Sequence, residues 1–229
     1  MIEVIEVTKK FGRRKVLQGV SFTANKGEVT SLIGINGVGK TTLLKAIMGL
    51  TPVNSGTIQV NGEPFNKTSY EKVSFIPDAL TMLPRMKLSE AMGFMADFYQ
   101  NWNQERAHEL LAFFKLQASD RLSDLSKGNA AKANLLFGLA LDTEFILMDE
   151  PFSGIDIFSR EQISEVFSSE LVEERGVILT THEINEIEHL IDQAILLEQG
   201  RVVKAFYPED VRETEGKSLI DVMREVYKG

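Results

Sequence analysis

One glycine-rich segment, residues 34–41, constrains this chain more than any other feature of its sequence. It reads GINGVGKT and matches the pattern G-x-x-x-x-G-K-[ST]. A strand is predicted before it at residues 28–33, and a helix with apolar helical spacing after it at residues 41–50. In that setting the glycines let backbone N–H groups turn around a phosphate at the positive end of the helix. The sequence therefore predicts a phosphate-binding loop at residues 34–41, called the phosphate loop below.

Polar side chains in and beside the phosphate loop suit a nucleoside triphosphate. Lys40 offers an ammonium group to the β- and γ-phosphate oxygens, and the Thr41 hydroxyl is a ligand for Mg²⁺. ATP and Mg²⁺ are therefore the expected cofactors. A glycine turn that merely ends a strand is the alternative, and the flanking strand and helix disfavour it. The other loop residues expected to contact the nucleotide are Asn36, Gly37, Gly39 and Thr42.

Two adjacent carboxylates follow a second apolar strand, predicted at residues 145–148. Alone, such a pair is more often solvated at the end of a strand. Together with the phosphate loop it indicates an ATPase site, where one carboxylate joins the Mg²⁺ shell and the next activates water. Asp149 is the expected metal-side residue, and Glu150 is the expected general base.

Composition narrows the class of protein. The 229 residues allow one compact body with at most one inserted lobe. The formal net charge of −8 argues against a nucleic-acid partner, because such proteins usually carry a basic excess. With no cysteine there is no disulfide framework, which fits the cytosol. No uninterrupted apolar run is long enough to span a bilayer, and residues 1–10 do not read as a signal peptide, so a membrane role needs a partner.

Further strand patterns lie on both sides of the phosphate loop. Residues 3–7 read as a strand, and residues 56–60 read as another that leads into the turn Asn61-Gly62. Because Asn-Gly suits a tight hairpin with positive φ, an antiparallel flap beside a parallel core is expected. Later strands are predicted at residues 177–180 and 195–197, the second followed by a turn at Gly200.

Helical patterns dominate after Pro77. Residues 89–100 and 103–116 are helix candidates, and Ser89 and Asn103 are their expected N-caps. A polar C-terminal segment ends in a further helix candidate at residues 218–227. These patterns predict an inserted helical lobe before the strand at residues 145–148, and a helical appendage at the C-terminal end.

With these elements in order, the chain resembles the ATP-binding subunits of ABC transporters. Residues 125–129 read LSKGN and look like the family's signature LSGGQ, with Ser126 and Gly128 matching. A helix that begins there offers free N–H groups and a hydroxyl to an anion, although an ordinary N-cap is the alternative. The resemblance implies that this segment contacts ATP held by a second subunit, so that two chains sandwich two nucleotides as a head-to-tail dimer.

The resemblance implies roles for three further residues. Asp156 looks like part of the family's D-loop, which crosses the dimer interface, with a polar turn at a helix start as the alternative. His182, in the segment 180–183, looks like the switch histidine that senses the γ-phosphate and keeps water and Glu150 in register. Phe11 occupies the place of the adenine-stacking aromatic residue, with a plain core phenylalanine as the alternative.

Asp78 is the position that departs most from the family pattern. The family usually has a glutamine there, which joins the Mg²⁺ site to the contact with the membrane subunit. A carboxylate is a shorter, charged Mg²⁺ partner, so Asp78 is a candidate metal residue beside Thr41 and Asp149. Lys127 and Asn129 depart from the family signature as Asp78 departs from the usual glutamine. These three departures favour assignment of the chain to the ATPases that serve ABC-2 type exporters, which include bacterial drug and peptide efflux systems.

The resulting expectation is an α/β fold with a P-loop NTPase core, a mixed sheet, an antiparallel β subdomain and an inserted helical lobe. The core lobe is predicted at residues 1–77 and 141–205, the helical signature lobe at 78–140, and a C-terminal helical appendage at 206–229. The resemblance implies an ATPase that works as a homodimer or heterodimer with transmembrane subunits. It is expected in the cytoplasm, at the inner face of the cell membrane, and without a nucleic-acid partner.

Two other functions use the same motifs. One is an ABC ATPase that acts on ribosomes, DNA repair or Fe–S cluster assembly, although the chain has a single cassette and no long coiled-coil insertion. The other is a nucleotide kinase that transfers phosphate to a small acceptor. The signature-like segment just before the acidic strand argues against the kinase.

Overall fold

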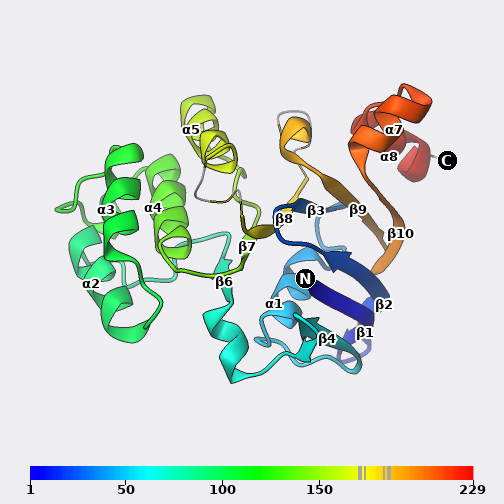
Figure 1. Cartoon of the computed structure of the whole chain (residues 1–229), viewed down its shortest axis with the longest axis horizontal. Coiled ribbons are helices and arrows are strands. Elements are labelled where there is room, and N and C mark those ends of the chain that lie inside the picture. The colour runs from blue at the N-terminus through cyan, green and yellow to red at the C-terminus, as the bar shows by residue number, and fades with distance from the viewer. Residues whose placement is uncertain (170–171, 173, 183, 185–186, 229) are drawn as a thin grey trace.

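The computed structural model describes residues 1–169, 172, 174–182, 184 and 187–228, and the structural statements refer to these residues. Within them the strands form two sheets (Figure 1). The strands are β1 Ile2–Phe11, β2 Arg14–Ala24, β3 Val29–Ile33, β4 Ser55–Val60, β5 Glu63–Pro64, β6 Val73–Ile76, β7 Phe145–Asp149, β8 Gly176–Thr181, β9 Gln193–Glu198 and β10 Arg201–Phe206.

The smaller sheet is four-stranded and antiparallel, in the order β2-β1-β4-β5. Asn61 (φ 54°) and Gly62 (φ 81°) make the turn between β4 and β5, so the predicted flap and its turn are confirmed. Strand β2 was not predicted. The alternation of buried and more exposed residues along β2 is interrupted at Gly19, where the pairing of β1 with β2 also shifts register. The sequence therefore does not show the two-residue period that is typical of a strand.

The larger sheet has six strands in the order β10-β9-β3-β8-β7-β6. Neighbouring strands are parallel except for β10, which pairs with β9 antiparallel. Every residue of β7 and β8 is buried, as expected for strands covered on both faces. The mixed α/β fold and the antiparallel subdomain are therefore confirmed.

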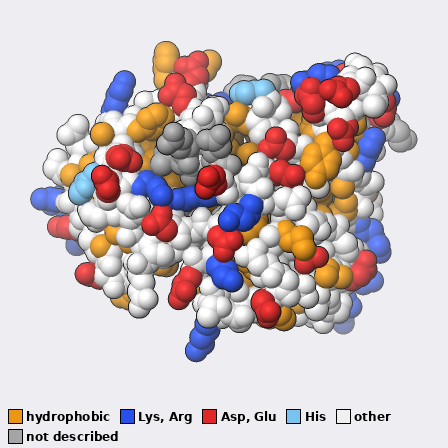
Figure 2. All heavy atoms as spheres, viewed as in Figure 1, with side chains coloured by type: hydrophobic (Ala, Val, Ile, Leu, Met, Phe, Trp, Pro, Cys, Tyr) orange, Lys and Arg blue, Asp and Glu red, His pale blue; other side chains and the backbone are white. Residues whose placement is uncertain are grey.

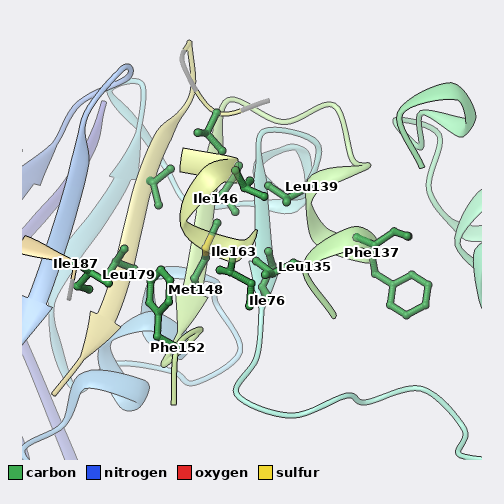
Figure 3. Packing of buried hydrophobic residues seen from close by; sticks show 14 of the residues in the cluster. Ile76, Leu135, Phe137, Leu139, Ile146, Met148, Phe152, Ile163, Leu179 and Ile187 are labelled. Carbon is green, nitrogen blue, oxygen red and sulfur yellow. The ribbon is translucent and has the colours of Figure 1, made fainter. Parts of the chain in front are cut away.

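Helices cover both faces of the larger sheet. The helices of the described residues are α1 Lys40–Ile47, α2 Leu88–Phe98, α3 Gln104–Phe113, α4 Lys127–Leu139, α5 Ile157–Phe167, α7 Pro208–Glu215 and α8 Leu219–Lys228, and α2 and α3 stand away from the sheet beyond α4. Helix α1 packs with the smaller sheet in one apolar cluster, whereas α4, α5 and α8 contribute to the other. Figure 3 shows this second cluster, where Leu135 and Leu139 of α4 lie beside Ile76 and Ile146 of the strands.

Helices α2, α3 and α4 lie between β6 and β7 in sequence and form the left-hand group in Figure 1. Asn103 caps α3 as predicted, since its side chain accepts the Arg106 N–H. The prediction that Ser89 is the N-cap of α2 was wrong. The N-cap of α2 is Lys87, whose N–H is bound by the Glu90 carboxylate at 2.9 Å, so Ser89 already lies inside the helix.

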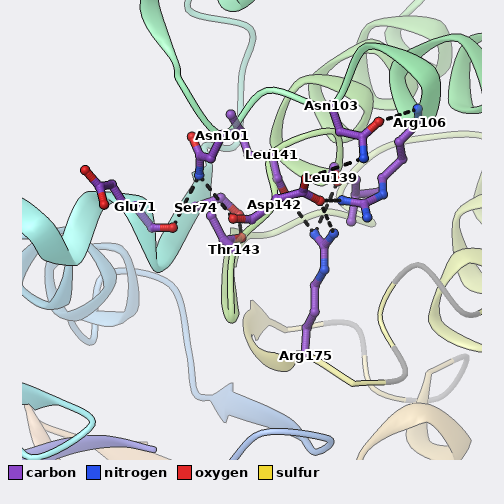
Figure 4. Close-up of polar contacts among 10 residues, drawn as sticks. All are labelled: Glu71, Ser74, Asn101, Asn103, Arg106, Leu139, Leu141, Asp142, Thr143 and Arg175. Atoms are coloured by element: carbon purple, nitrogen blue, oxygen red, sulfur yellow. Dashed lines mark hydrogen bonds and ion pairs between the residues drawn. The ribbon is translucent and has the colours of Figure 1, made fainter.

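A polar cluster centred on Asp142 joins these helices to the larger sheet (Figure 4). Asp142 is ion-paired with Arg106 of α3, and Asn101 donates to its carbonyl at 3.2 Å. Arg175, just before β8, donates to the carbonyls of Leu139 and Leu141 at 3.2 and 3.0 Å. Burial lowers the pKa of Arg175 to about 10. The cluster therefore satisfies carbonyls at the end of α4, where the chain leaves the helices for β7.

Gly138 of α4 packs against Ile76 of β6 with no room for a methyl group, because a Cβ built there overlaps Ile76 Cγ1. Gly138→Ala is therefore expected to lower the free energy of unfolding by about 1–3 kcal/mol, the usual cost of overpacking. Gly93→Ala in α2, where the glycine faces open space, is expected to raise it by about 0.5–1 kcal/mol. Urea unfolding measures both, and shifts of the same sign would contradict this packing.

The C-terminal segment is helical as predicted, with α7 and α8. Helix α7 carries the acidic residues Glu209, Asp210, Glu213 and Glu215, and acidic side chains gather in its region of Figure 2. None of the described helices is long and apolar enough to cross a membrane.

Candidate functional site

The predicted site residues lie at one edge of the larger sheet because parallel strands end there together. The phosphate loop follows β3, Asp149 ends β7, and His182 follows β8. Ile33 pairs with Thr181 and Asp149 pairs with Thr180, so three neighbouring strands end at the same level. The carboxyl ends of such strands are where open α/β sheets bind ligands.

The phosphate loop needs its glycines for conformation and for space. Gly37 (φ 80°) and Gly39 (φ 118°) adopt conformations that L-residues rarely reach. A Cβ on Gly34 would lie 2.6 Å from the carbonyl oxygen of Leu197, and one on Gly39 would lie 3.0 Å from that of Val16. Gly39 is also the N-cap of α1, so the loop leads directly into the positive end of the helix.

Lys40 is held at the mouth of the loop by two oxygen atoms. Its Nζ donates to the Gly34 carbonyl at 2.7 Å and lies 3.2 Å from Glu150 Oε1. The Lys40 side chain is 5% exposed. A buried ammonium group that already faces anionic oxygen suits a phosphate group, so Lys40 fits the predicted role.

Asp149 is fixed by two threonine hydroxyls. Thr41 and Thr180 donate to Asp149 Oδ1 at 3.0 and 2.7 Å. Burial raises the pKa of Asp149, with a further contribution from the charges of Asp78 and Glu150, although both hydroxyls oppose the shift. A hydroxyl and a carboxylate side by side are hard oxygen donors of the kind that Mg²⁺ prefers, so the residues fit this ion.

Glu150 stands between a cation and a histidine. Its Oε2 lies 2.8 Å from His182 Nδ1, and its other carboxylate oxygen, Oε1, contacts Lys40. Its backbone has φ 48°, an uncommon value for a non-glycine residue, and its N–H donates to Thr180 Oγ1 at 2.9 Å. Glu150 is thus held in a strained, well-defined position. Glu183, in the predicted switch segment, lies outside the described residues.

A pocket of about 500 Å³ adjoins these groups. Phe11, a residue that is 52% exposed, lines it, and Lys9 Nζ lies 4.8 Å from the centroid of its ring. Two lining residues, Arg14 and Val16, were not predicted, and Arg14 donates to the Gly37 carbonyl at 3.3 Å. The predicted residues that line the pocket with Phe11 are Asn36, Gly37, Gly39, Lys40, Thr41, Thr42 and Glu150.

Asp78 is exposed just beyond β6 and lies between two hollows. A cavity of about 200 Å³ is lined by Asp78 together with Asp149 and Glu150. Asp78 also lines a larger groove of about 540 Å³, between α1 and the group of α2 and α4. The residue therefore lies near the acidic pair and reaches the groove as well.

The signature and D-loop residues contact each other rather than the pocket. Ser126 caps α4 by accepting the Asn129 N–H at 3.2 Å, and Asp156 caps α5 by accepting the Ser159 N–H at 2.9 Å. The hydrogen bonds from Ser159 lower the pKa of Asp156. A Cβ on Gly128 would overlap Ser159 Oγ and lie 2.8 Å from Asp156 Oδ2. The described lining of the 500 Å³ pocket does not include Ser126, Gly128 or Asp156.

Comparison with known proteins identifies the family. The family model of ABC transporters matches residues 17–153. The chain belongs to the ABC transporter family. The Nod factor export ATP-binding protein I of Burkholderia lata is 32% identical, over 96% of this chain and 76% of the relative. The petrobactin import ATP-binding protein YclP of Bacillus subtilis is 31% identical, over 99% of this chain and 92% of the relative.

Solved structures agree with this ABC assignment. An ATP-binding subunit of an ABC transporter superposes with a TM-score of 0.88 and 27% identity, covering 99% of both chains. An ATP-binding cassette in a dimeric post-hydrolysis state with ADP and Pi has a TM-score of 0.79 and 23% identity, over 90% of this chain and 98% of that one, and shows the fold alone. This chain is therefore an ATP-hydrolysing subunit of an ABC transporter, which uses ATP with Mg²⁺ and works with separate membrane subunits. The alternative interpretation of the sequence, a nucleotide kinase, is wrong.

Proposed function

We propose that the pocket beside the phosphate loop is the ATPase site, with Glu150 as general base. The observation that carries this proposal is the position of Glu150, which lies 3.2 Å from Lys40 and 2.8 Å from His182. A carboxylate fixed between a phosphate-binding cation and a histidine is arranged to orient and deprotonate an attacking water.

The other residues bind and position ATP. Lys40 and the backbone N–H groups at the start of α1 hold the β- and γ-phosphates, and Phe11 offers a partly exposed ring to the adenine. Thr41 and Asp149 would hold Mg²⁺, and Asp78, which lines a cavity together with Asp149, is a further candidate residue for the ion. Bound Mg²⁺ supplies positive charge to the phosphoryl oxygens. His182 keeps Glu150 in place while the γ-phosphate is present.

We propose that the second half of each site comes from another subunit. Ser126 and Gly128 stand at the start of α4 and are absent from the described lining of the ATP pocket. Helix α4 therefore has a positive N-terminal end that remains for the nucleotide of a partner. The dimeric ATP-binding cassette with ADP and Pi, which shares this fold, supports a head-to-tail pair, whether homodimer or heterodimer.

Complementation between two inactive variants tests this arrangement. Lys40→Met removes the phosphate-binding cation, and Ser126→Asp keeps a good N-cap for α4 but places a negative charge near the partner's γ-phosphate. Each variant alone is expected to hydrolyse ATP poorly, because every site in its homodimer is defective. Their mixture is expected to regain activity, since a mixed head-to-tail dimer contains one intact site. A mixture as inactive as its components would contradict shared sites.

The remaining predictions concern the setting of the subunit. We propose the lobe boundaries given above, with the core at 1–77 and 141–205, the helical lobe at 78–140 and the appendage at 206–229. The named relatives include an exporter and an importer subunit, and service to an ABC-2 type exporter stays a prediction based on Asp78, Lys127 and Asn129. Attachment to the cytoplasmic face of the membrane follows from the membrane partner. Copurification with a polytopic membrane protein, rather than with Fe–S assembly factors, tests this setting.

A further inference from the structure

Helix α8 lies over the strands that lead into the ATP site. Its apolar residues recur with helical spacing, and the buried members are Leu219 and Val222. They pack in the same cluster as Ile33 of β3, Leu179 of β8 and Leu196 of β9. The partly buried residues that continue the stripe are Ile220, Met223, Val226 and Tyr227.

Polar contacts fasten α8 at both ends. At its first turn, the Leu219 N–H donates to Glu188 Oε1 at 2.8 Å, and Arg212 of α7 lies 3.8 Å from the same carboxylate oxygen. At its last turn, the Tyr227 hydroxyl lies 3.2 Å from the Ile33 carbonyl oxygen and 3.1 Å from that of Leu197. A helix fixed at both ends and along one face has a defined position, so its last turn can hold another element in place.

Tyr227 meets the chain immediately before the phosphate loop. Ile33 is the last residue of β3, and its carbonyl belongs to the peptide bond that opens the loop at Gly34. Leu197 O is also the atom that a Cβ on Gly34 would meet at 2.6 Å. The Tyr227 hydroxyl thus shares its one hydrogen between the two carbonyl oxygens that border Gly34, one of them in β3 and the other in β9.

The contacts continue from Gly34 to the acidic pair. Gly34 O accepts the Lys40 ammonium at 2.7 Å, and Lys40 lies 3.2 Å from Glu150. Burial raises the pKa of Tyr227 to about 12, so its hydroxyl keeps the proton that it donates at neutral pH. A chain of adjacent contacts therefore runs from the last turn of α8 to the groups that face the phosphates.

We propose that Tyr227 is a positioning residue for the phosphate loop, through which α8 sets the affinity of the site for ATP. The hydroxyl fixes the Ile33–Gly34 peptide and holds the end of β3 against β9. The loop then keeps the geometry in which Gly34 O and Lys40 meet. This inference rests on the proposed role of the phosphate loop and adds a residue from the C-terminal helix to it.

Tyr227→Phe tests the proposal, because phenylalanine keeps the ring in the apolar cluster and removes only the hydroxyl. The KM for ATP is expected to rise roughly two- to tenfold, the range for losing one hydrogen bond, while kcat changes less. The Kd of a fluorescent ATP analogue is expected to rise by a similar factor. Steady-state hydrolysis, analogue titration and thermal unfolding are measured on the whole 229-residue chain.

Tyr207→Phe is the matched control. Tyr207 precedes α7, and its hydroxyl interacts with Asn25, next to the strand ends opposite the phosphate loop. This variant is expected to leave KM and kcat at wild-type values. The proposal is overturned if Tyr227→Phe has wild-type KM and Kd, whether or not its melting temperature falls. If Lys40→Met still loses ATP binding in that case, the phosphate-loop assignment stands and only the role of Tyr227 fails.

Discussion

Glu150→Gln is expected to slow ATP hydrolysis by roughly 10²- to 10⁴-fold, the usual contribution of a positioned general base. Glutamine has the size of glutamate and can still accept a hydrogen bond, but it cannot take a proton from water. ATP binding is expected to persist, because Lys40 keeps its contact with Gly34 O and the phosphate loop is unchanged. Dimers that form on ATP should therefore accumulate. Single-turnover hydrolysis and size-exclusion chromatography with ATP measure the two effects.

Glu144→Gln provides the control for Glu150→Gln on the same strand. Glu144 precedes β7 as Glu150 follows it, and its partners are Lys26 at 3.3 Å and Asn61 at 3.2 Å. Those contacts lie away from the ATP pocket, so hydrolysis by this variant should equal that of the wild type. Hydrolysis by Glu150→Gln at the wild-type rate would show that another group deprotonates the water.

Features fixed by short-range chemistry could be predicted from the sequence. The phosphate loop, the strand before Asp149 and the Asn61-Gly62 turn each depend on a few adjacent residues, and the structure contains all three elements. The α2 cap was missed because serine is the commoner cap, whereas here Glu90 binds the Lys87 N–H. Strand β2 was missed because its register shift breaks the alternation of buried residues.

Contacts between distant segments could not be read from the sequence. Thr180 had no assigned role, yet it binds both Asp149 and the N–H of Glu150, because β8 lies beside β7 in the sheet. Gly128 was assigned to a nucleotide contact alone. Its position against Asp156 and Ser159 shows that packing of α4 on α5 already excludes a larger residue there. A substitution at Gly128 therefore tests packing and nucleotide contact together.

Lys40→Met is expected to weaken ATP binding strongly and to lower the rate of hydrolysis by roughly 10²- to 10³-fold, as for loss of one preorganised donor to a developing negative charge. Methionine keeps an unbranched apolar stem in a site where the lysine side chain is 5% exposed, so the fold should survive. Removing the ammonium group also leaves Glu150 without the cation that lies 3.2 Å away. Titration with a fluorescent ATP analogue and steady-state hydrolysis measure the two losses.

Lys45→Met separates the Lys40 effect from a general loss of positive charge on α1. Lys45 is exposed in the last turn of the same helix and is expected to leave ATP affinity unchanged. Lys40→Met and Glu150→Gln are expected to have different effects on ATP binding, although the two side chains are in contact. Without Lys40 the chain no longer holds ATP, whereas without the Glu150 carboxylate it holds ATP and fails to cleave it. If both variants lost ATP binding equally, the division of the site into a phosphate-binding cation and a water-activating base would be wrong.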